Sequence, residues 1–115
     1  MSFQIKQKDS YSWPVKFDIP EDGQYRRETF NAVFKNISQS RFQELIELSQ
    51  SDDFNDVDIV REVVIGWSGI TDDKDEEIPF TKAKLEQLLD VLGLATAIAS
   101  SFVESRKGSA AKRKN

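Results

Sequence analysis

The chain has 115 residues, a length typical of one domain, and 38% of them are apolar, including eight phenylalanines and two tryptophans, which excludes whole-chain disorder. It contains no cysteine and no histidine, which excludes disulfides, thiolate metal sites and the proton-transfer chemistry of histidine. The last ten residues hold five basic and no acidic side chains, so the net charge of −4 leaves −9 over residues 1–105, and such an acidic body repels nucleic acid phosphates.

Two stretches near the start alternate apolar and polar residues, as half-buried strands do. They are VKFDI at 15–19 and ETFNAVF at 28–34, and PEDGQ between them supplies the Pro, Asp and Gly of a turn. The pattern predicts an antiparallel β-hairpin. Its apolar rows need cover, because an isolated two-stranded hairpin is only marginally stable in water. These rows are Val15, Phe17 and Ile19 on one strand and Phe30, Ala32 and Phe34 on the other.

Helical spacing replaces the alternation near Ile37. A first helix through RFQELIELSQ, capped by Ser38 or Ser40, is predicted to end at SDDFND. A second helix is predicted to begin near Asp56, where acids favour the positive end of the helix dipole. Its apolar stripe is Val57, Val60 and Val64. The β-branched residues of IVREVVIGW are also typical of a strand, so both interpretations stay open there.

Two further helices are predicted in the last third of the chain. Thr81 caps the first, whose apolar stripe continues to Gly93, and the second ends near Arg106 and Lys107, where cations suit the dipole. The sequence therefore predicts an α+β fold, a single domain of residues 1–107 in which the N-terminal antiparallel β-hairpin packs on three to four helices. Residues 108–115 are predicted to form a disordered basic C-terminal tail. The two stripes are Leu85, Leu88, Leu89 and Leu92, and Leu94, Ala97, Ile98, Ser101 and Phe102.

No segment approaches the roughly 18 uninterrupted apolar residues of a membrane helix. The N-terminal stretch MSFQIKQKDS lacks the apolar core of a signal peptide. We therefore expect the protein to stay in the cytosol and to have no membrane partner.

The stretch IGWSGITDDKDEEIPF at 65–80 combines a tryptophan with five acidic residues. A calcium loop starting at Asp73 requires a glycine at its sixth position and a glutamate at its twelfth, but Ile78 and Lys84 stand there. A solvated loop is therefore predicted. Adjacent acids such as Glu76 and Glu77 resemble an acid–base pair only superficially, and the sequence has no phosphate-binding loop or nucleophile elbow. We expect no catalytic residues, no cofactor and no metal.

Large apolar side chains provide the remaining candidate residues. Trp67 ends an apolar run, so it is interpreted as a core anchor in preference to a ligand-binding residue. Trp13 and Phe80 are interpreted as structural anchors in the same way. The Phe-rich hairpin and the Leu-rich third helix can together supply an apolar groove with a polar rim, the kind of groove that accepts one face of a helix. The candidate partner-binding apolar face is Leu85, Leu88, Leu89 and Phe102.

Several motifs, in their order and spacing, resemble the tail assembly chaperones of long-tailed bacteriophages, small proteins encoded just upstream of the tape measure protein. The motifs are YSWPVKFDIP at 11–20, VVIGWSGITDD at 63–73, EEIPFTKAKLEQLLD at 76–90 and AAKRKN at 110–115. They span most of the chain. One departure is that DDKDEE holds no glycine, where relatives often have one for a tight turn.

The resemblance implies a non-catalytic protein of the host bacterial cytoplasm that binds the tape measure protein. The chaperone keeps this partner soluble while tail tube protein polymerises around it, then leaves, and is absent from the mature virion. The resemblance also implies a homo-oligomer on the partner, and a longer product, made by backward ribosomal slippage, that recruits the tail tube protein. The present chain is then the shorter product.

The last residues, KRKN, are compatible with such slippage. Codons for Arg113, Lys114 and Asn115 can form A-AAA-AAC or G-AAA-AAC, on which tRNAs re-pair one base back. The alternative is a solubilising basic tail. Two rival functions also stay open, a structural tail-completion or head–tail connector protein and a regulator whose basic tail binds nucleic acid. Such a regulator would bind nucleic acid without reading its sequence, because tail cations contact phosphates and not base edges.

Overall fold

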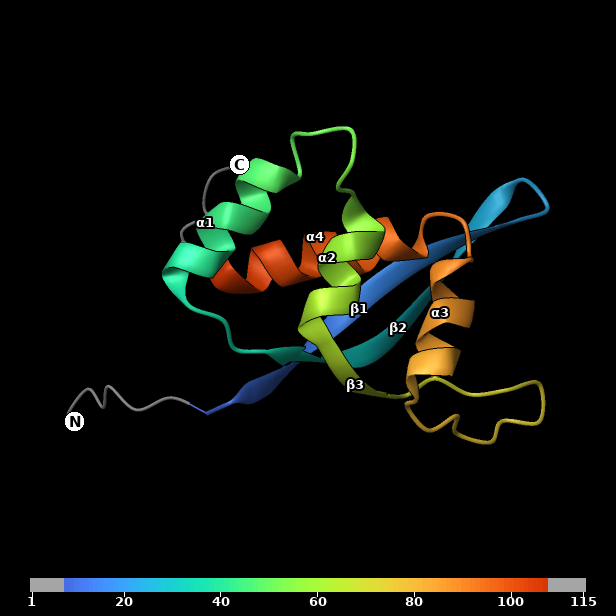
Figure 1. Ribbon diagram of the computed structural model, residues 1–115. Coiled ribbons are helices and arrows are strands. Elements are labelled where there is room, and N and C mark those ends of the chain that lie inside the picture. Colours follow the sequence, from blue (N-terminus) through green and yellow to red (C-terminus); the bar gives the residue numbers. More distant parts are fainter. Residues whose placement is uncertain (1–7, 108–115) are drawn as a thin grey trace.

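A long β-hairpin and a short third strand form the sheet of this computed structural model, which describes residues 8–107 (Figure 1). The predicted α+β class and the N-terminal hairpin are confirmed. The predicted basic tail at 108–115 and the KRKN end lie outside the described residues. The strands are β1 (Ser10–Glu21), β2 (Gln24–Lys35) and β3 (Val64–Ser68), antiparallel in the order β1-β2-β3.

The hairpin is longer than its alternating pattern predicts, because each strand has 12 residues. Asp22 and Gly23 link the strands with φ of 50° and 81°. Two successive positive φ angles define the turn that matches the right-handed twist of paired strands. Pro14 and Pro20 both lie in β1. That strand is at the edge of the sheet, where a residue without an N–H group is tolerated.

Each of the first three helices begins at a side-chain cap that accepts backbone N–H groups. The Ser38 hydroxyl accepts from Arg41, which selects Ser38 over Ser40 as the first cap. Asn55 forms a capping box with Asp58. Thr81 accepts from the backbone N–H of Lys84, as predicted. The helices are α1 (Gln39–Leu48), α2 (Asp56–Val63), α3 (Lys82–Leu89) and α4 (Leu94–Lys107).

The segment IVREVVIGW was compatible with a helix and with a strand, and each interpretation is correct for one part of it. The segment is helical to Val63, and Val64 then takes extended angles of −88° and 120° and begins β3. The strand forms because β2 offers an unpaired edge, on which Trp67 lies opposite Ala32. Local propensity is balanced between helix and strand here, and pairing with β2 decides the outcome.

The predicted end of the third helix at Gly93 is wrong. Helix α3 stops at Leu89, and tight backbone hydrogen bonds carry the chain through residues 90–93 into α4. The helical stripe is therefore interrupted, and the side chain of Leu92 is 96% exposed instead of packed. Gly93 completes this corner with φ of 85°, a conformation that glycine adopts without steric cost.

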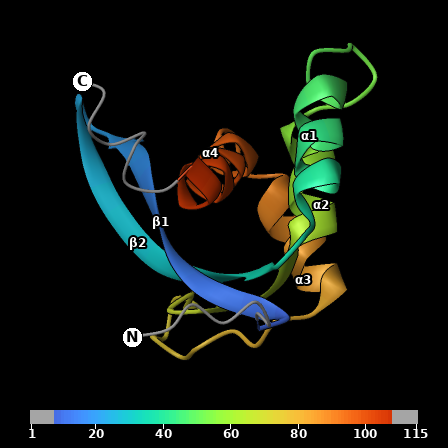
Figure 2. The same cartoon turned by 90° about the vertical axis from the view of Figure 1, so that its left-hand side faces the viewer.

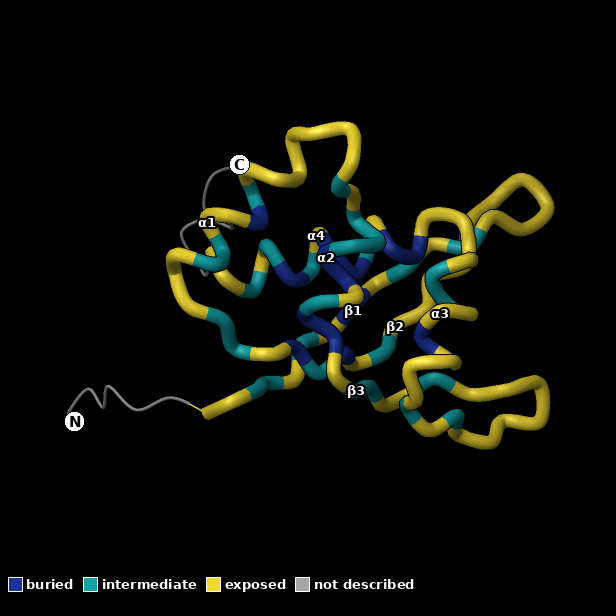
Figure 3. Tube along the Cα trace, in the orientation of Figure 1, coloured by how far each residue is buried: buried dark blue, intermediate teal, exposed yellow. Residues whose placement is uncertain are grey.

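All four helices lie on the concave side of the curved sheet, with α4 nearest the hairpin (Figure 2). Many of the buried segments lie in the middle of the molecule, where α2 and α4 overlap the hairpin in this view (Figure 3). The rings of Phe34 and Phe102 pack edge to face with centroids 5.2 Å apart, and the Tyr11 hydroxyl is 2.7 Å from Ser105 Oγ. The largest fully buried side chains are Phe34, Phe102, Leu45, Ile98, Val15, Val60 and Val63.

Within residues 8–107, no single helix has the length and apolar character needed to cross a membrane. Helices α3 and α4 satisfy the length and composition criteria only as a pair, and their axes are bent by 108°.

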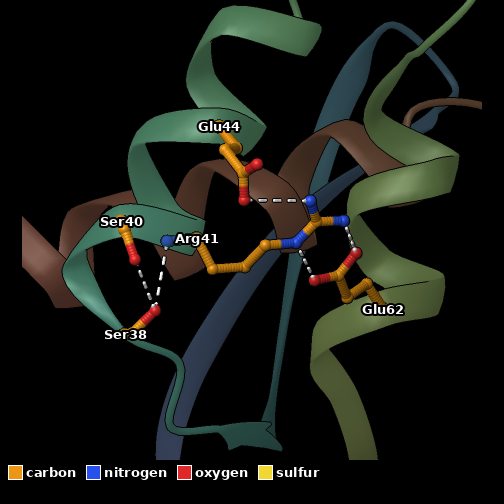
Figure 4. Close-up of polar contacts among 5 residues, drawn as sticks. All are labelled: Ser38, Ser40, Arg41, Glu44 and Glu62. Carbon is orange, nitrogen blue, oxygen red and sulfur yellow. Dashed lines mark hydrogen bonds and ion pairs between the residues drawn. The ribbon is translucent and has the colours of Figure 1, made fainter.

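An arginine fork joins α1 to α2 (Figure 4). Arg41 donates from Nε and Nη2 to the two carboxylate oxygens of Glu62, at 2.7 and 2.6 Å, and makes a longer contact of 3.4 Å with Glu44. Paired, parallel hydrogen bonds between charged groups are stronger than neutral ones. These hydrogen bonds hold the pKa of the Glu62 carboxyl below its ordinary value of 4.5.

This pair predicts a dependence of stability on pH. Because the pKa of Glu62 is lower in the folded than in the unfolded state, the ion pair stabilises the fold fully at pH values above the ordinary pKa. This stabilisation is lost as the pH falls through the folded-state pKa. The loss of unfolding free energy in Glu62→Gln is therefore expected to be largest near neutral pH and to shrink below about pH 4. Urea unfolding at a series of pH values measures it.

The control for this prediction is Glu44→Gln, which removes the longer and more exposed contact with the same arginine. It is expected to change stability little at any pH. A loss in Glu62→Gln that is the same in acid and at neutral pH would contradict the assignment of the effect to the ion pair.

Candidate binding groove

The four residues predicted to form a partner-binding face do not share one surface. Leu85 and Phe102 are only 4% and 1% exposed, so they belong to the core and are not available on the surface of this fold. Leu88 and Leu89 are half-buried at its edge. The prediction of one face is corrected because α4 turns Phe102 toward the sheet, where it meets Phe34.

A groove does lie between the hairpin and the third helix. The hairpin forms one wall, the start of the loop after β3 forms a second, and α3 with the α3–α4 corner forms the third. The groove has a volume of about 360 Å³. Its lining residues are Phe17, Ile19, Glu28, Thr29, Phe30, Gly69, Ile70, Thr71, Leu88, Val91 and Leu94.

The lining of this groove is mainly apolar, because seven of its eleven residues have large apolar side chains. A groove between α1, α2 and α4 is larger, at about 470 Å³, but only four of its nine lining residues are apolar. Apolar lining with few polar groups is typical of binding sites. The groove between the hairpin and α3, which we call the hairpin groove, is therefore the better candidate.

The α3–α4 corner positions the third wall of the hairpin groove. A side chain at Gly93 would start 3.7 Å from the ring of Phe17, so the corner lies directly over the hairpin. Val91, just before it, lines the groove and is 43% exposed. The sequence patterns indicate Leu88 and the hairpin residues of this groove but not Val91 or Ile70. Nothing in the sequence marks Val91 except that an apolar residue follows the last turn of α3.

The predicted anchor residues fix the loop that follows β3. The indole Nε1 of Trp67 donates to the backbone oxygen of Ile78 at 2.7 Å, and its ring packs edge to face with Phe80 at 4.8 Å. Both ends of the acidic loop are thereby held together. Trp67 and Phe80 are half-buried rather than central, and so is Trp13, which packs against the core from β1.

The acidic loop is exposed, as predicted, but it is also ordered by its own hydrogen bonds. Asp72 Oδ1 accepts from the backbone N–H groups of Lys74 and Glu76, and Glu77 accepts from Gly69. Asp75 takes the positive φ of 61° at the tip. An aspartate therefore adopts the left-handed conformation in a loop that contains no glycine between Asp72 and Glu77, and aspartate tolerates this conformation better than most residues.

Metal binding is not indicated anywhere in residues 8–107. No group of three or more Asp or Glu side chains there is arranged to hold an ion. What the geometry offers is an apolar groove whose lining includes Glu28, Thr29 and Thr71 as its polar residues.

Comparison of the chain with protein-family models, with curated proteins and with solved structures found no match.

Proposed function

We propose that this protein is a tail assembly chaperone of a long-tailed bacteriophage that binds the tape measure protein and keeps it soluble. Two arguments support the proposal. The sequence resembles that family over most of its length. The hairpin groove is a mainly apolar hollow of about 360 Å³, and it is the observation that carries the proposal.

Binding is proposed to follow the helix-in-groove mode. An amphipathic helix presents apolar residues at spacings of three and four, and these residues enter the groove against Phe17, Phe30 and Leu88. A long helical protein that exposes such a stripe aggregates through it, so covering the stripe keeps the protein soluble. The reaction is association alone and uses no catalytic residue.

The wider assembly is part of the same proposal and is supported by the resemblance alone. Many copies cover one tape measure protein in the host cytoplasm, and a longer, frameshifted form recruits the tail tube protein. The chaperone then leaves before the virion matures. Mass spectrometry of purified virions tests this last step, because a structural tail-completion or connector protein would be found in them.

Co-expression with the tape measure protein tests both the function and the site. The wild-type chain is expected to raise the soluble yield of its partner and to be recovered with it in a pull-down. Val91→Asp places a charge in the groove. It is expected to lower the amount of recovered complex at least about tenfold, which corresponds to a loss of roughly 1.4 kcal/mol of binding free energy.

Leu48→Asp is the matched control. Leu48 is 39% exposed, close to the value for Val91, but it lies on α1 and lines none of the grooves described above. This variant is expected to bind like the wild type. If the tape measure protein stays insoluble with the wild-type chain and no complex is recovered, the function is wrong. If both variants bind normally, the function stands and the site is wrong.

A further inference from the structure

Three carboxylates beside the hairpin groove have no role in holding the fold. The acidic loop 72–77 contains five acids and one lysine, a net charge of −4. Asp72 and Glu77 accept backbone hydrogen bonds that shape the loop. Among residues 8–107, no side-chain hydrogen bond or ion pair is made by Asp73, Asp75 or Glu76, and all three are exposed. These three residues are the free carboxylates of the loop.

The free carboxylates lie close to the groove. Thr71 lines it, and two residues of chain span at most about 7 Å, which places the backbone of Asp73 within that distance. The bridge between Thr71 and Glu77 keeps the backbone of Glu76, one residue before Glu77, close to Thr71 as well. At physiological ionic strength, charges interact over about 8 Å before salt screens them. A ligand in the groove is therefore within the electrostatic range of the loop.

None of the eleven residues that line the groove is positively charged. Glu28 is the single charged residue in the described lining, and its contact with Arg26 is long, at 3.9 Å. The groove therefore combines an apolar floor with an edge of negative sign. Complementary charges around an apolar centre set specificity and speed association more than they add affinity.

We propose that the hairpin groove selects an amphipathic helix whose apolar stripe is flanked by lysine or arginine, with the free carboxylates as its acidic edge. The inference rests on the proposed function only in assuming that the groove binds a helix. It adds the chemistry of the partner segment. Lys and Arg on the flanks of the helix meet Asp73 and Glu76 while the stripe fills the hollow between the hairpin and α3.

Synthetic helical peptides test this preference by fluorescence anisotropy. Three peptides of about five turns share one leucine stripe and carry Lys, Gln or Glu on both flanks. A fourth carries the same lysines with its leucines scrambled off the stripe. The Lys peptide is expected to bind tightest and to weaken with added salt, whereas the Glu and scrambled peptides bind weakest.

Two matched double variants locate the charge effect. Asp73→Asn with Glu76→Gln removes two of the three charges of the acidic edge and leaves Asp72 and Glu77 to hold the loop. Asp52→Asn with Asp53→Asn removes the same charge from the exposed loop between α1 and α2. The first variant is expected to bind the Lys peptide about fivefold more weakly, the size of two exposed charge pairs, and the second to bind it like the wild type.

Each other outcome has a distinct meaning. Equal binding of Lys and Glu peptides, lost in Val91→Asp, overturns the charge preference and leaves the groove in place. Equal weakening by both double variants overturns the assignment to the acidic edge. If no peptide binds, the groove of the proposed function is wrong as well. If the wild-type chain is a dimer and the Val91→Asp variant is a monomer, a second copy of the chain covers the groove. That result also overturns the inference.

Discussion

Phe102→Ala is expected to lower the free energy of unfolding by about 3–5 kcal/mol, the cost of removing a large aromatic side chain from a packed core. Phe102 is one of the most buried large side chains and packs against two other rings, those of Phe34 at 5.2 Å and Phe42 at 6.0 Å. The three rings join β2, α1 and α4. The loss is a large fraction of the roughly 5–15 kcal/mol that stabilises an ordinary domain.

Chemical denaturation of Phe102→Ala beside Leu92→Ala measures this difference. Both residues are apolar and both belong to predicted helical stripes, yet Leu92 is almost fully exposed. Leu92→Ala is expected to change stability by no more than about 0.5 kcal/mol. Similar denaturation midpoints for the two variants would show that Phe102 is not part of the core, and its earlier assignment to a binding face would regain support.

The contrast between Phe102 and Leu92 shows what a one-dimensional pattern determines. Helical periodicity predicts which residues share a face, and it placed Phe102 correctly with Leu94 and Ile98, which are also buried. It does not say whether that face meets the sheet or a partner. Nor does it show where a helix stops, so the stripe of α3 was extended to Leu92, beyond the turn that begins at Asp90.

Features set by nearest neighbours were predicted most accurately. Thr81 was predicted outright as a cap and the first cap was narrowed to Ser38 or Ser40, because a cap depends on a hydroxyl and a backbone N–H three residues away. The hairpin groove needs three segments that are distant in sequence. Leu88 and Phe30 were identified because they belong to regular elements, whereas Ile70 and Val91 lie in a loop and a corner whose positions depend on the fold.

Trp67→Ala is expected to lower the free energy of unfolding by about 2–4 kcal/mol, near the lower end of large aromatic truncations because the side chain is half-buried. Two interactions are lost together, the edge-to-face contact with Phe80 and the hydrogen bond to the Ile78 carbonyl. Trp67→Phe keeps an aromatic ring but removes the donor. It is expected to cost about 1–2 kcal/mol, because the carbonyl loses its partner.

The two Trp67 variants also separate the stability of the domain from the order of the acidic loop. Trp67 and Phe80 stand at opposite ends of this loop, so their contact holds its ends together. In Trp67→Phe, amide hydrogen exchange is therefore expected to rise more at Asp72, Glu76 and Ile78, whose amides bond within the loop, than at Val60 in the core. A uniform rise across these amides would mean that Trp67 stabilises the domain as a whole. A loop-specific rise, together with weaker binding of the lysine-flanked peptide, would show that the tryptophan holds the acidic edge in place beside the groove.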